Sequence, residues 1–445
     1  MRAFIASSIG VICAAVLVLP LAVPAGAAPD TPAVPAESVE PPDVPGSTQS
    51  LPLTPLPVPS GRATGEPTRT AEAAEQGLPE HGVRPFSLVG VVWDDVDTEL
   101  RGTVQVRTRA IGTTRWSDWQ DLETHNAEHA ADLGTAERES GTVRGSTAPL
   151  WVGDSDGVAA RVFPDSTDPQ DRNAPAVPLP TGLRVELVDP GKDPQPLPAA
   201  GAGAGETGDD RTTPLDGLVL PALSKAETEA RSEAEAGLAS GAQPYIGPRP
   251  RIITRMGWGA DEKLREDAFV YTKSVKAAFI HHSATGNNYK CTQAASVLRG
   301  IYRYHVKSSG WRDIGYNFVV DKCGSIYEGR AGGVTKAVLG AHTLGFNSNS
   351  SGIAVLGTFT DSKPPAAAVN AIAKLTAWKL GLSGANPQGK TTLVSGGGNK
   401  FKKGKKVKLN VISGHRDGFA TECPGERLYE KLGSARTSSA HLQGR

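Results

Sequence analysis

Gly414-His-Arg-Asp-Gly-Phe-Ala-Thr-Glu-Cys-Pro-Gly425 carries the strongest chemical signal of this 445-residue chain. It places His415 and Cys423 eight positions apart, and the pair His281-His282 lies far upstream. Two imidazoles and one thiolate would give a zinc ion three protein ligands and leave a fourth position for water, as in catalytic zinc sites. The sequence therefore predicts a zinc hydrolase with His281, His415 and Cys423 as metal ligands. A purely structural zinc is the alternative, and three protein ligands instead of four argue against it.

Strands alternate with long helices around these ligands. Residues 275–280 form an apolar run that ends at His281, and 407–413 form another that ends just before His415. Apolar stripes predict helices over 292–307 and 366–380. Further strands are expected at 314–320, 325–328 and 351–356. We therefore predict an α/β domain over residues 248–432, a mixed sheet flanked by helices, followed by a tail at 433–445.

Residues 85–190 show a different pattern, in which short runs alternate apolar and polar side chains between turn signals. This spacing predicts an all-β, sandwich-like domain. Its tryptophans suggest a carbohydrate platform, but we favour a packing role for most of them. His125 and His129 lie in a polar, loop-like stretch, and the sequence gives them no ligand role. The expected strands are 86–93, 102–109, 114–119, 148–151, 157–163 and 182–188.

Two segments have the composition of linkers. Residues 28–84 are rich in Pro, Ala and Glu and hold few aromatic side chains, so they predict a disordered spacer. Residues 191–247 are rich in Ala and Gly and are also interpreted as a linker, with a short polar helix expected over 224–236.

The first residues predict export. Arg2 precedes an uncharged apolar run, and Ala25-Gly-Ala27 follows as a small-residue cleavage site. This order is typical of a secretory signal peptide over residues 1–27, with an extracellular or wall-associated mature protein. A membrane anchor is the alternative, but no basic stop-transfer cluster follows, and no later segment predicts a membrane span.

Charge gives little guidance to partners. The chain has 47 acidic and 47 basic residues, so nothing steers it toward nucleic acid. One local basic cluster is interpreted as a solvated hairpin tip, and contact with an anionic wall polymer is the functional alternative. The cluster contains Lys400, Lys402, Lys403, Lys405 and Lys406.

The four cysteines divide into three groups. Cys13 lies within the predicted signal peptide, and Cys423 is the predicted metal ligand. Cys291 and Cys323 remain as an even pair, for which a disulfide is the default in an exported protein. Participation of Cys323 in the metal site is the alternative.

Six stretches of residues 248–432 resemble the peptidoglycan recognition protein and type 2 N-acetylmuramoyl-L-alanine amidase family, and they occur in the order that the family has. They are Phe279-Ile-His-His-Ser-Ala-Thr285, Gly315-Tyr-Asn-Phe318, Tyr327-Glu-Gly-Arg330, Gly340-Ala-His-Thr-Leu-Gly-Phe-Asn347, Gly352-Ile-Ala-Val-Leu-Gly357 and the Gly414–Gly425 stretch. The β-rich segment and the Pro-rich spacer also resemble the layout of secreted actinomycete amidases.

The resemblance implies roles for individual residues. His281, His415 and Cys423 match the family's zinc ligands, Tyr316 matches a tyrosine beside the metal, and Thr421 stands where cleaving relatives have a lysine or a threonine. Three further residues match positions that line the muropeptide groove: His342, Asn347 and, more weakly, Arg330.

The implied activity is hydrolysis of the amide between N-acetylmuramic acid and the L-alanine of the peptidoglycan stem peptide. Relatives that only bind peptidoglycan lack the cysteine ligand, which favours the enzyme over a non-catalytic receptor. A wall-anchoring module is a third possibility. Without the resemblance, Tyr316 would be interpreted as a core residue, as His305 is, and His282 as a packed histidine or one that orients a ligand.

Overall fold

The computed structural model describes residues 46–56, 75–124, 126–168, 170, 174–193, 217–236 and 245–445. The predicted signal peptide, Cys13 and His125 lie outside these residues. Every helix in the described ranges is too short or too polar to span a bilayer.

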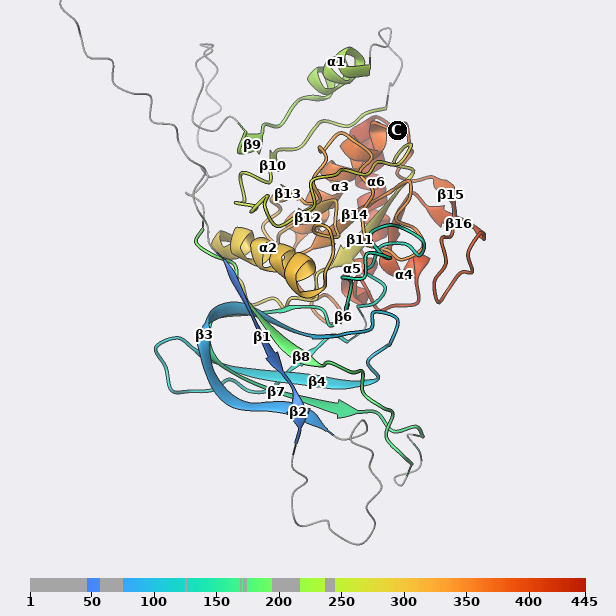
Figure 1. The fold of residues 1–445 in the computed structure, drawn as a ribbon. Coiled ribbons are helices and arrows are strands. Elements are labelled where there is room, and N and C mark those ends of the chain that lie inside the picture. The colour runs from blue at the N-terminus through green and yellow to red at the C-terminus, as the bar shows by residue number, and fades with distance from the viewer. Residues whose placement is uncertain are drawn as a thin grey trace, which may run out of the picture. The chain divides into compact units, whose positions relative to one another are not determined.

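The β-rich domain, residues 46–193, is built on one connected sheet (Figure 1). Its main path has the order β1-β8-β3-β7-β4-β5, and β2 and β6 both pair with β3. Alternate side chains of β3, β4, β7 and β8 form a buried core that includes Val91, Val106, Val158 and Leu187. The strands are β1 (Ser47–Pro52), β2 (Thr54–Pro55), β3 (Gln76–Trp93), β4 (Gly102–Ala110), β5 (Gln120–Leu122), β6 (Gly145–Ser146), β7 (Leu150–Pro164) and β8 (Arg184–Asp189).

The predicted boundaries of this domain are wrong at its start. Residues 46–56 and 75–84, which composition assigned to a disordered spacer, hold β1, β2 and the first half of β3. β1 pairs along its whole length with β8. Backbone hydrogen bonds to β8 therefore stabilise this strand, although it has few apolar side chains. In β3, register shifts between Leu78 and Phe86 accommodate Pro79 and Pro85. The strand expected at 114–119 is absent from the structure, and β5 begins at Gln120.

The C-terminal domain, described over residues 217–236 and 245–445, contains a seven-stranded mixed sheet of order β17-β11-β14-β12-β13-β10-β9. β11 lies between two parallel neighbours and is buried at every position, as its apolar sequence predicts. The strands are β9 (Val219–Leu220), β10 (Ile252–Ile253), β11 (Ala277–His282), β12 (Phe318–Val320), β13 (Ile326–Glu328), β14 (Ser350–Val355) and β17 (Ile412–Gly414). A separate hairpin joins β15 (Lys390–Val394) to β16 (Lys406–Asn410).

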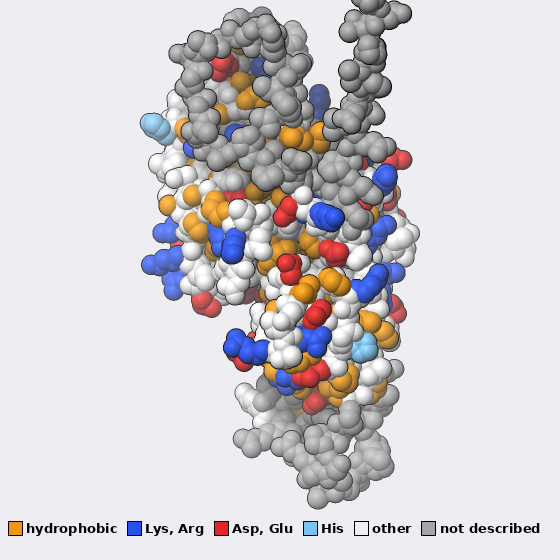
Figure 2. Space-filling view, turned by 90° about the vertical axis from the view of Figure 1, so that its left-hand side faces the viewer, with side chains coloured by type: hydrophobic (Ala, Val, Ile, Leu, Met, Phe, Trp, Pro, Cys, Tyr) orange, Lys and Arg blue, Asp and Glu red, His pale blue; other side chains and the backbone are white. Residues whose placement is uncertain are grey.

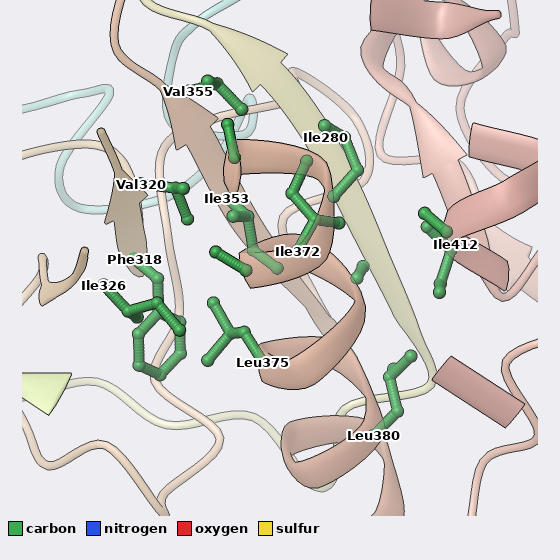
Figure 3. Packing of buried hydrophobic residues seen from close by; sticks show 14 of the residues in the cluster. Ile280, Phe318, Val320, Ile326, Ile353, Val355, Ile372, Leu375, Leu380 and Ile412 are labelled. Atoms are coloured by element: carbon green, nitrogen blue, oxygen red, sulfur yellow. The ribbon is translucent and has the colours of Figure 1, made fainter. Parts of the chain in front are cut away.

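Helices cover both faces of this sheet, which confirms the predicted α/β architecture (Figure 1). On one face Ile280, Phe318 and Ile353 pack against Ile372 and Leu375 of α3 (Figure 3). On the other face, strand residues pack against α2. The helical segments are α1 (Lys225–Ala236), the 3-10 turn η2 (Cys291–Gln293), α2 (Ala294–Arg303), the π-helical turn η3 (Tyr304–Ser308), α3 (Ala366–Gly381), α4 (His415–Gly418), α5 (Glu426–Tyr429) and α6 (Leu432–Gln443).

The two domains share a core. Leu88 and Val92 of β3 and Val188 of β8 belong to the same buried cluster as Val297 and Ile301 of α2. This apolar contact fixes the β-rich domain against the C-terminal domain, so loops of one can reach into the other.

Both ends of the predicted α/β domain also need correction. Residues 433–445, expected to form a tail, belong mostly to α6, which packs on α3. The Gln443 side-chain amide donates to the Ala377 carbonyl at 2.9 Å, and the Thr376 hydroxyl donates to the Ser439 hydroxyl at 3.1 Å. Part of the predicted 191–247 linker likewise joins the sheet as β9, whereas its expected polar helix is present as α1.

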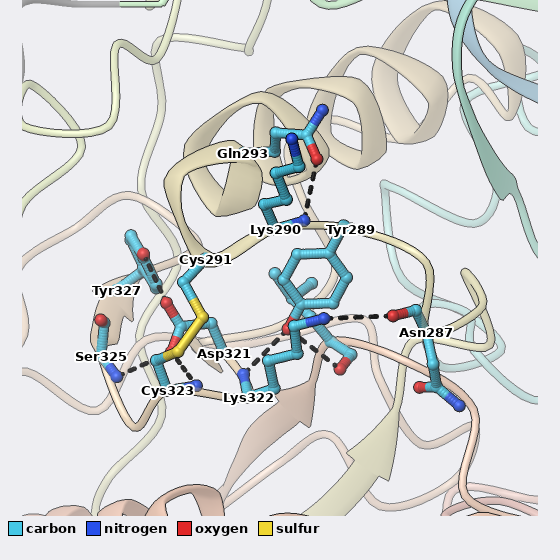
Figure 4. The surroundings of a disulfide bond; sticks show 11 residues. Asn287, Tyr289, Lys290, Cys291, Gln293, Asp321, Lys322, Cys323, Ser325 and Tyr327 are labelled. Atoms are coloured by element: carbon cyan, nitrogen blue, oxygen red, sulfur yellow. Dashed lines mark hydrogen bonds between the residues drawn. A yellow bond between two sulfur atoms is a disulfide. The ribbon is translucent and has the colours of Figure 1, made fainter.

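A disulfide links Cys291 to Cys323, as predicted, and fastens the start of η2 to the turn between β12 and β13 (Figure 4). The Asp321 carboxylate holds this turn by accepting from the backbone N–H groups of Cys323 and Ser325, each at 2.9 Å. The bridge closes a chain separation of 32 residues. The alternative in which Cys323 serves the metal is excluded, because its sulfur is in this bond.

Replacing both of these cysteines by serine is expected to lower the free energy of unfolding by about 2–4 kcal/mol, because the unfolded chain loses a cross-link. For a domain of this size that corresponds to a fall in Tm of about 5–10 °C, measurable by calorimetry. An unchanged Tm would contradict a stabilising role for the bridge.

The surface shown in Figure 2 carries interspersed acidic and basic side chains, in keeping with zero net charge. The predicted basic cluster lies on the exposed connection between β15 and β16 and on Lys406, the first residue of β16. The Lys400 ammonium donates to the Arg416 carbonyl. The location of the cluster matches the predicted hairpin tip, and its contact with an anionic polymer stays a prediction.

Candidate metal centre

The carboxyl ends of two neighbouring parallel strands bring His281 and His415 together. Ile280 of β11 is opposite Gly414 of β17, so the histidines that follow lie side by side, with ring centroids 4.5 Å apart. Both imidazoles are completely buried. Their positions follow from the predicted strands, because parallel strands present their carboxyl ends at the same edge of a sheet.

Cys423 reaches the same edge from the loop between α4 and α5. The loop is closed by the Arg416 N–H, which donates to the Cys423 carbonyl at 3.0 Å, and the Cys423 N–H donates to the Thr421 hydroxyl at 3.1 Å. The Cys423 Sγ lies 3.7 Å from His281 Nδ1. With bond lengths of about 2.0 Å to nitrogen and about 2.3 Å to sulfur, two ligands of a tetrahedral zinc lie about 3.5 Å apart.

A fourth residue of this cluster, His129, comes from the β-rich domain. Its Nε2 lies 3.7 Å from Cys423 Sγ, and its ring centroid lies 4.5 Å from that of His415. The ligand atoms of His129, His281, His415 and Cys423 all lie within 4.8 Å of one another. The sequence interpretation, which gave His129 no ligand role, differs from the structure here.

The nitrogen and sulfur atoms of this cluster are better suited to binding a metal ion than to hydrogen-bonding one another. Neither ring nitrogen of His415 has a hydrogen-bond partner among the described residues, and the same holds for Nδ1 of His129. Burial lowers the pKa of His281 and His415 well below the usual value, which keeps the imidazoles neutral and able to donate a lone pair. Burial also raises the pKa of the Cys423 thiol, so its thiolate needs a cation beside it. Two or three imidazoles with one thiolate form a donor set typical of zinc.

Tyr316 lies beside the cluster, in the turn before β12. Its ring centroid is 5.5 Å from that of His281 and 5.9 Å from that of His129. Burial raises the pKa of its phenol well above the usual value, so the hydroxyl keeps its proton and can act as a donor. The side chain therefore lies beside the candidate ligands, and its role in the reaction stays a prediction.

Thr421 is hydrogen-bonded to the β-rich domain. Its hydroxyl donates to the Glu128 carboxylate at 2.7 Å. Burial raises the pKa of Glu128 to about 8 despite this bond. The sequence missed Glu128, which belongs to the same loop as His129.

The predicted groove residues are buried and hold local structure. The side-chain amide oxygen Oδ1 of Asn347 accepts from the backbone N–H groups of His342 and Thr343, at 2.7 and 3.0 Å. The Thr343 hydroxyl lies 3.0 Å from His342 Nδ1 and 3.4 Å from His281 Nε2, so it orients the second nitrogen of that candidate ligand. Arg330 forms two parallel hydrogen bonds of 2.8 Å to the Glu137 carboxylate, and both side chains are buried.

His282 and His305 lie outside the metal cluster, as predicted. The Nδ1 of His282 accepts from the Phe359 N–H at 3.3 Å. The Nδ1 of His305 accepts from the Gly315 N–H at 3.3 Å, and its ring packs 4.3 Å from that of Trp311. Both are buried side chains that support the walls of the site.

The fold and the site thus define a mixed α/β domain that gathers a buried cluster of histidines and a cysteine at the carboxyl edge of its sheet. Residues 271–426 match the family described as N-acetylmuramoyl-L-alanine amidase. Residues 34–179 match the family described as Rv3811 N-terminal galactose-binding domain-like, a span that includes the strands found before residue 85.

Peptidoglycan-recognition protein SC2 of Drosophila melanogaster is 34% identical over 183 residues, which cover 41% of this chain and 84% of the relative. The chain therefore belongs to the family of peptidoglycan recognition proteins and N-acetylmuramoyl-L-alanine amidases. The human N-acetylmuramoyl-L-alanine amidase is 31% identical over 186 residues, covering 41% of this chain and 28% of the relative. Among solved structures, Drosophila PGRP-LB is 27% identical to this chain, with a TM-score of 0.33. The aligned region covers 41% of this chain and 92% of the PGRP-LB chain.

Proposed function

We propose that this chain is a secreted, zinc-dependent N-acetylmuramoyl-L-alanine amidase, which hydrolyses the amide between N-acetylmuramic acid and the L-alanine of the stem peptide. The observation that carries the proposal is the convergence of His281, His415 and Cys423 within metal-binding distance of one another, next to Tyr316. The predicted export of the chain and peptidoglycan as its partner belong to the same proposal.

Zinc, when bound, would polarise the amide carbonyl and supply a nucleophile from water at neutral pH. The chain's own residues hold and orient the reactants. The Tyr316 phenol would donate a hydrogen bond to the amide oxygen as negative charge develops on it. Thr421 is too weak a base to remove a proton, so we assign it the orientation of water or substrate. His342, Asn347 and Arg330 would shape the groove that the muropeptide enters.

A non-catalytic receptor is the competing function within the same family. Such a receptor needs a groove but no metal. It gives no reason to bury an ionisable thiol in a cluster where both ring nitrogens of His415 and Nδ1 of His129 lack hydrogen-bond partners among the residues described. The donor set therefore favours the enzyme.

Mass spectrometry of the products from defined muropeptides tests the proposal. The full-length protein is expected to release an intact stem peptide with a free L-alanine amino group and the matching sugar with a free lactyl carboxyl group. Cuts within the peptide or between sugars would reject the assignment of the bond. If the protein binds the muropeptide but forms no product during long incubation with zinc, and His129→Ala behaves in the same way, the receptor would be favoured.

A further inference from the structure

The loop between β5 and β6, residues 123–144, enters the candidate metal centre. Its described residues form neither helix nor strand. Loops of this length without regular structure are uncommon in compact domains and are usually functional. In Figure 1 it is the teal loop that leads to β6 and passes beside α4 and α5. We name residues 126–144 the occluding segment.

Acidic side chains of the occluding segment are bonded to residues predicted to contact substrate. Glu128 accepts from Thr421. The Asp132 carboxylate accepts from the Asn347 amide and the Gly345 N–H, each at 2.7 Å. Glu137 holds Arg330 through the two bonds described above. A substrate that uses Thr421, Asn347 or Arg330 must first displace this segment.

The backbone of the segment also fits the C-terminal domain closely. The Leu344 N–H donates to the Glu128 carbonyl at 2.9 Å, and the Arg144 N–H donates to the Ser309 carbonyl at 3.0 Å. Gly310 has a φ of +74°, and a Cβ there would collide with the Thr142 carbonyl. Contacts therefore run along the whole segment and are not confined to His129.

The site has no room for substrate while the segment is in place. The cavity lined by Glu128, His129, Tyr316, Thr421 and Cys423 has a volume of about 10 Å³. That is about the space of one water molecule, whereas small-molecule sites measure about 300–1,000 Å³.

We propose that His129 is a fourth, displaceable ligand of the metal and that the occluding segment thereby holds this amidase in a latent form. Four protein ligands complete the tetrahedral shell of zinc and leave no position for water or an amide oxygen. The ligand that closes the shell comes from an irregular loop, so it can leave without disturbing the sheet that carries His281 and His415. The inference rests on the proposed function.

The test compares the full-length wild type with His129→Ala, both loaded with one equivalent of zinc. X-ray absorption at the zinc edge is expected to count three imidazoles and one sulfur in the wild type, and two imidazoles and one sulfur in His129→Ala. The variant is expected to hydrolyse a defined muropeptide at least about tenfold faster, because the population that can bind substrate increases.

Glu137→Gln supplies a second, independent variant, in which the side chains of all four candidate ligands are unchanged. It removes the carboxylate that holds Arg330, so it is expected to raise the rate and also the amide hydrogen exchange of residues 126–144, with fewer imidazoles on zinc. His81→Ala is the matched control, because His81 is an exposed histidine on β3 of the same domain. It is expected to leave ligand count and rate unchanged.

Two imidazoles on zinc in the wild type would overturn the inference. So would a His129→Ala protein that keeps its zinc without any gain in rate, or one that loses zinc, since the latter would mark a structural site. A wild type that binds no zinc, or that cuts another bond, would instead overturn the proposed function.

Discussion

Replacing Cys423 by serine is expected to remove tightly bound zinc and to lower the rate of muropeptide hydrolysis by at least about 1,000-fold. The Cys423 sulfur is buried 3.7 Å from nitrogens of both His281 and His129, so it provides the anionic ligand of the site. A serine hydroxyl does not ionise there and is a poor ligand. Loss of the metal removes several kcal/mol of transition-state stabilisation, and about 4 kcal/mol corresponds to about 1,000-fold.

This prediction is best measured in two backgrounds, the wild type and His129→Ala, so that latency does not hide the loss. Zinc content is read by mass spectrometry after dialysis against a weak chelator. The double change Cys291→Ser and Cys323→Ser is the matched control, because it makes the same substitution at the disulfide and should keep zinc and rate while lowering Tm. A Cys423→Ser protein with one zinc and nearly full rate would show that the ligand assignment is wrong.

The sequence predicted three members of the cluster because local features mark them. His281 and His415 each follow an apolar strand, and Cys423 lies a short loop away from His415. His129 has no such feature, since it sits in a polar stretch of another domain. Its position depends on the docking of β3 and β8 against α2, a contact between distant apolar side chains that no local pattern reveals.

Long-range contacts also account for the differences between the predicted and the observed fold. Long periodic segments such as α3 were predicted to within a residue or two, because apolar side chains recur along the helix and its second half is buried. β1 and α6 were missed because they are held by long-range partners. Gln49 of β1 exchanges hydrogen bonds with the Arg84 backbone, and α6, whose sequence is dominated by small and polar side chains, is held on α3. Composition alone therefore predicts domains that are shorter than those in the structure, because it leaves out β1, β9 and α6.

Replacing Tyr316 by phenylalanine is expected to lower kcat by about 100-fold while zinc content and KM stay nearly unchanged. The phenol is buried beside His281, and its raised pKa keeps the proton in place for donation. Loss of one donor to a developing oxyanion typically costs about 100-fold or more in rate, whereas ground-state binding is little affected. The measurement is steady-state kinetics on a defined muropeptide in the His129→Ala background, where the groove is open.

Tyr327→Phe is the matched control, because it removes an equally buried hydroxyl that instead bonds Asp321 near the disulfide. It should lower stability by about 1 kcal/mol through the lost hydrogen bond and leave kcat unchanged. If Tyr316→Phe behaves in the same way, Tyr316 is a core residue of the C-terminal domain and the oxyanion needs another donor. If Tyr316→Phe loses zinc, the phenol positions the ligands and does not act on the substrate. A selective fall in kcat with zinc retained distinguishes the catalytic role from both, because only an interaction formed in the transition state lowers kcat alone.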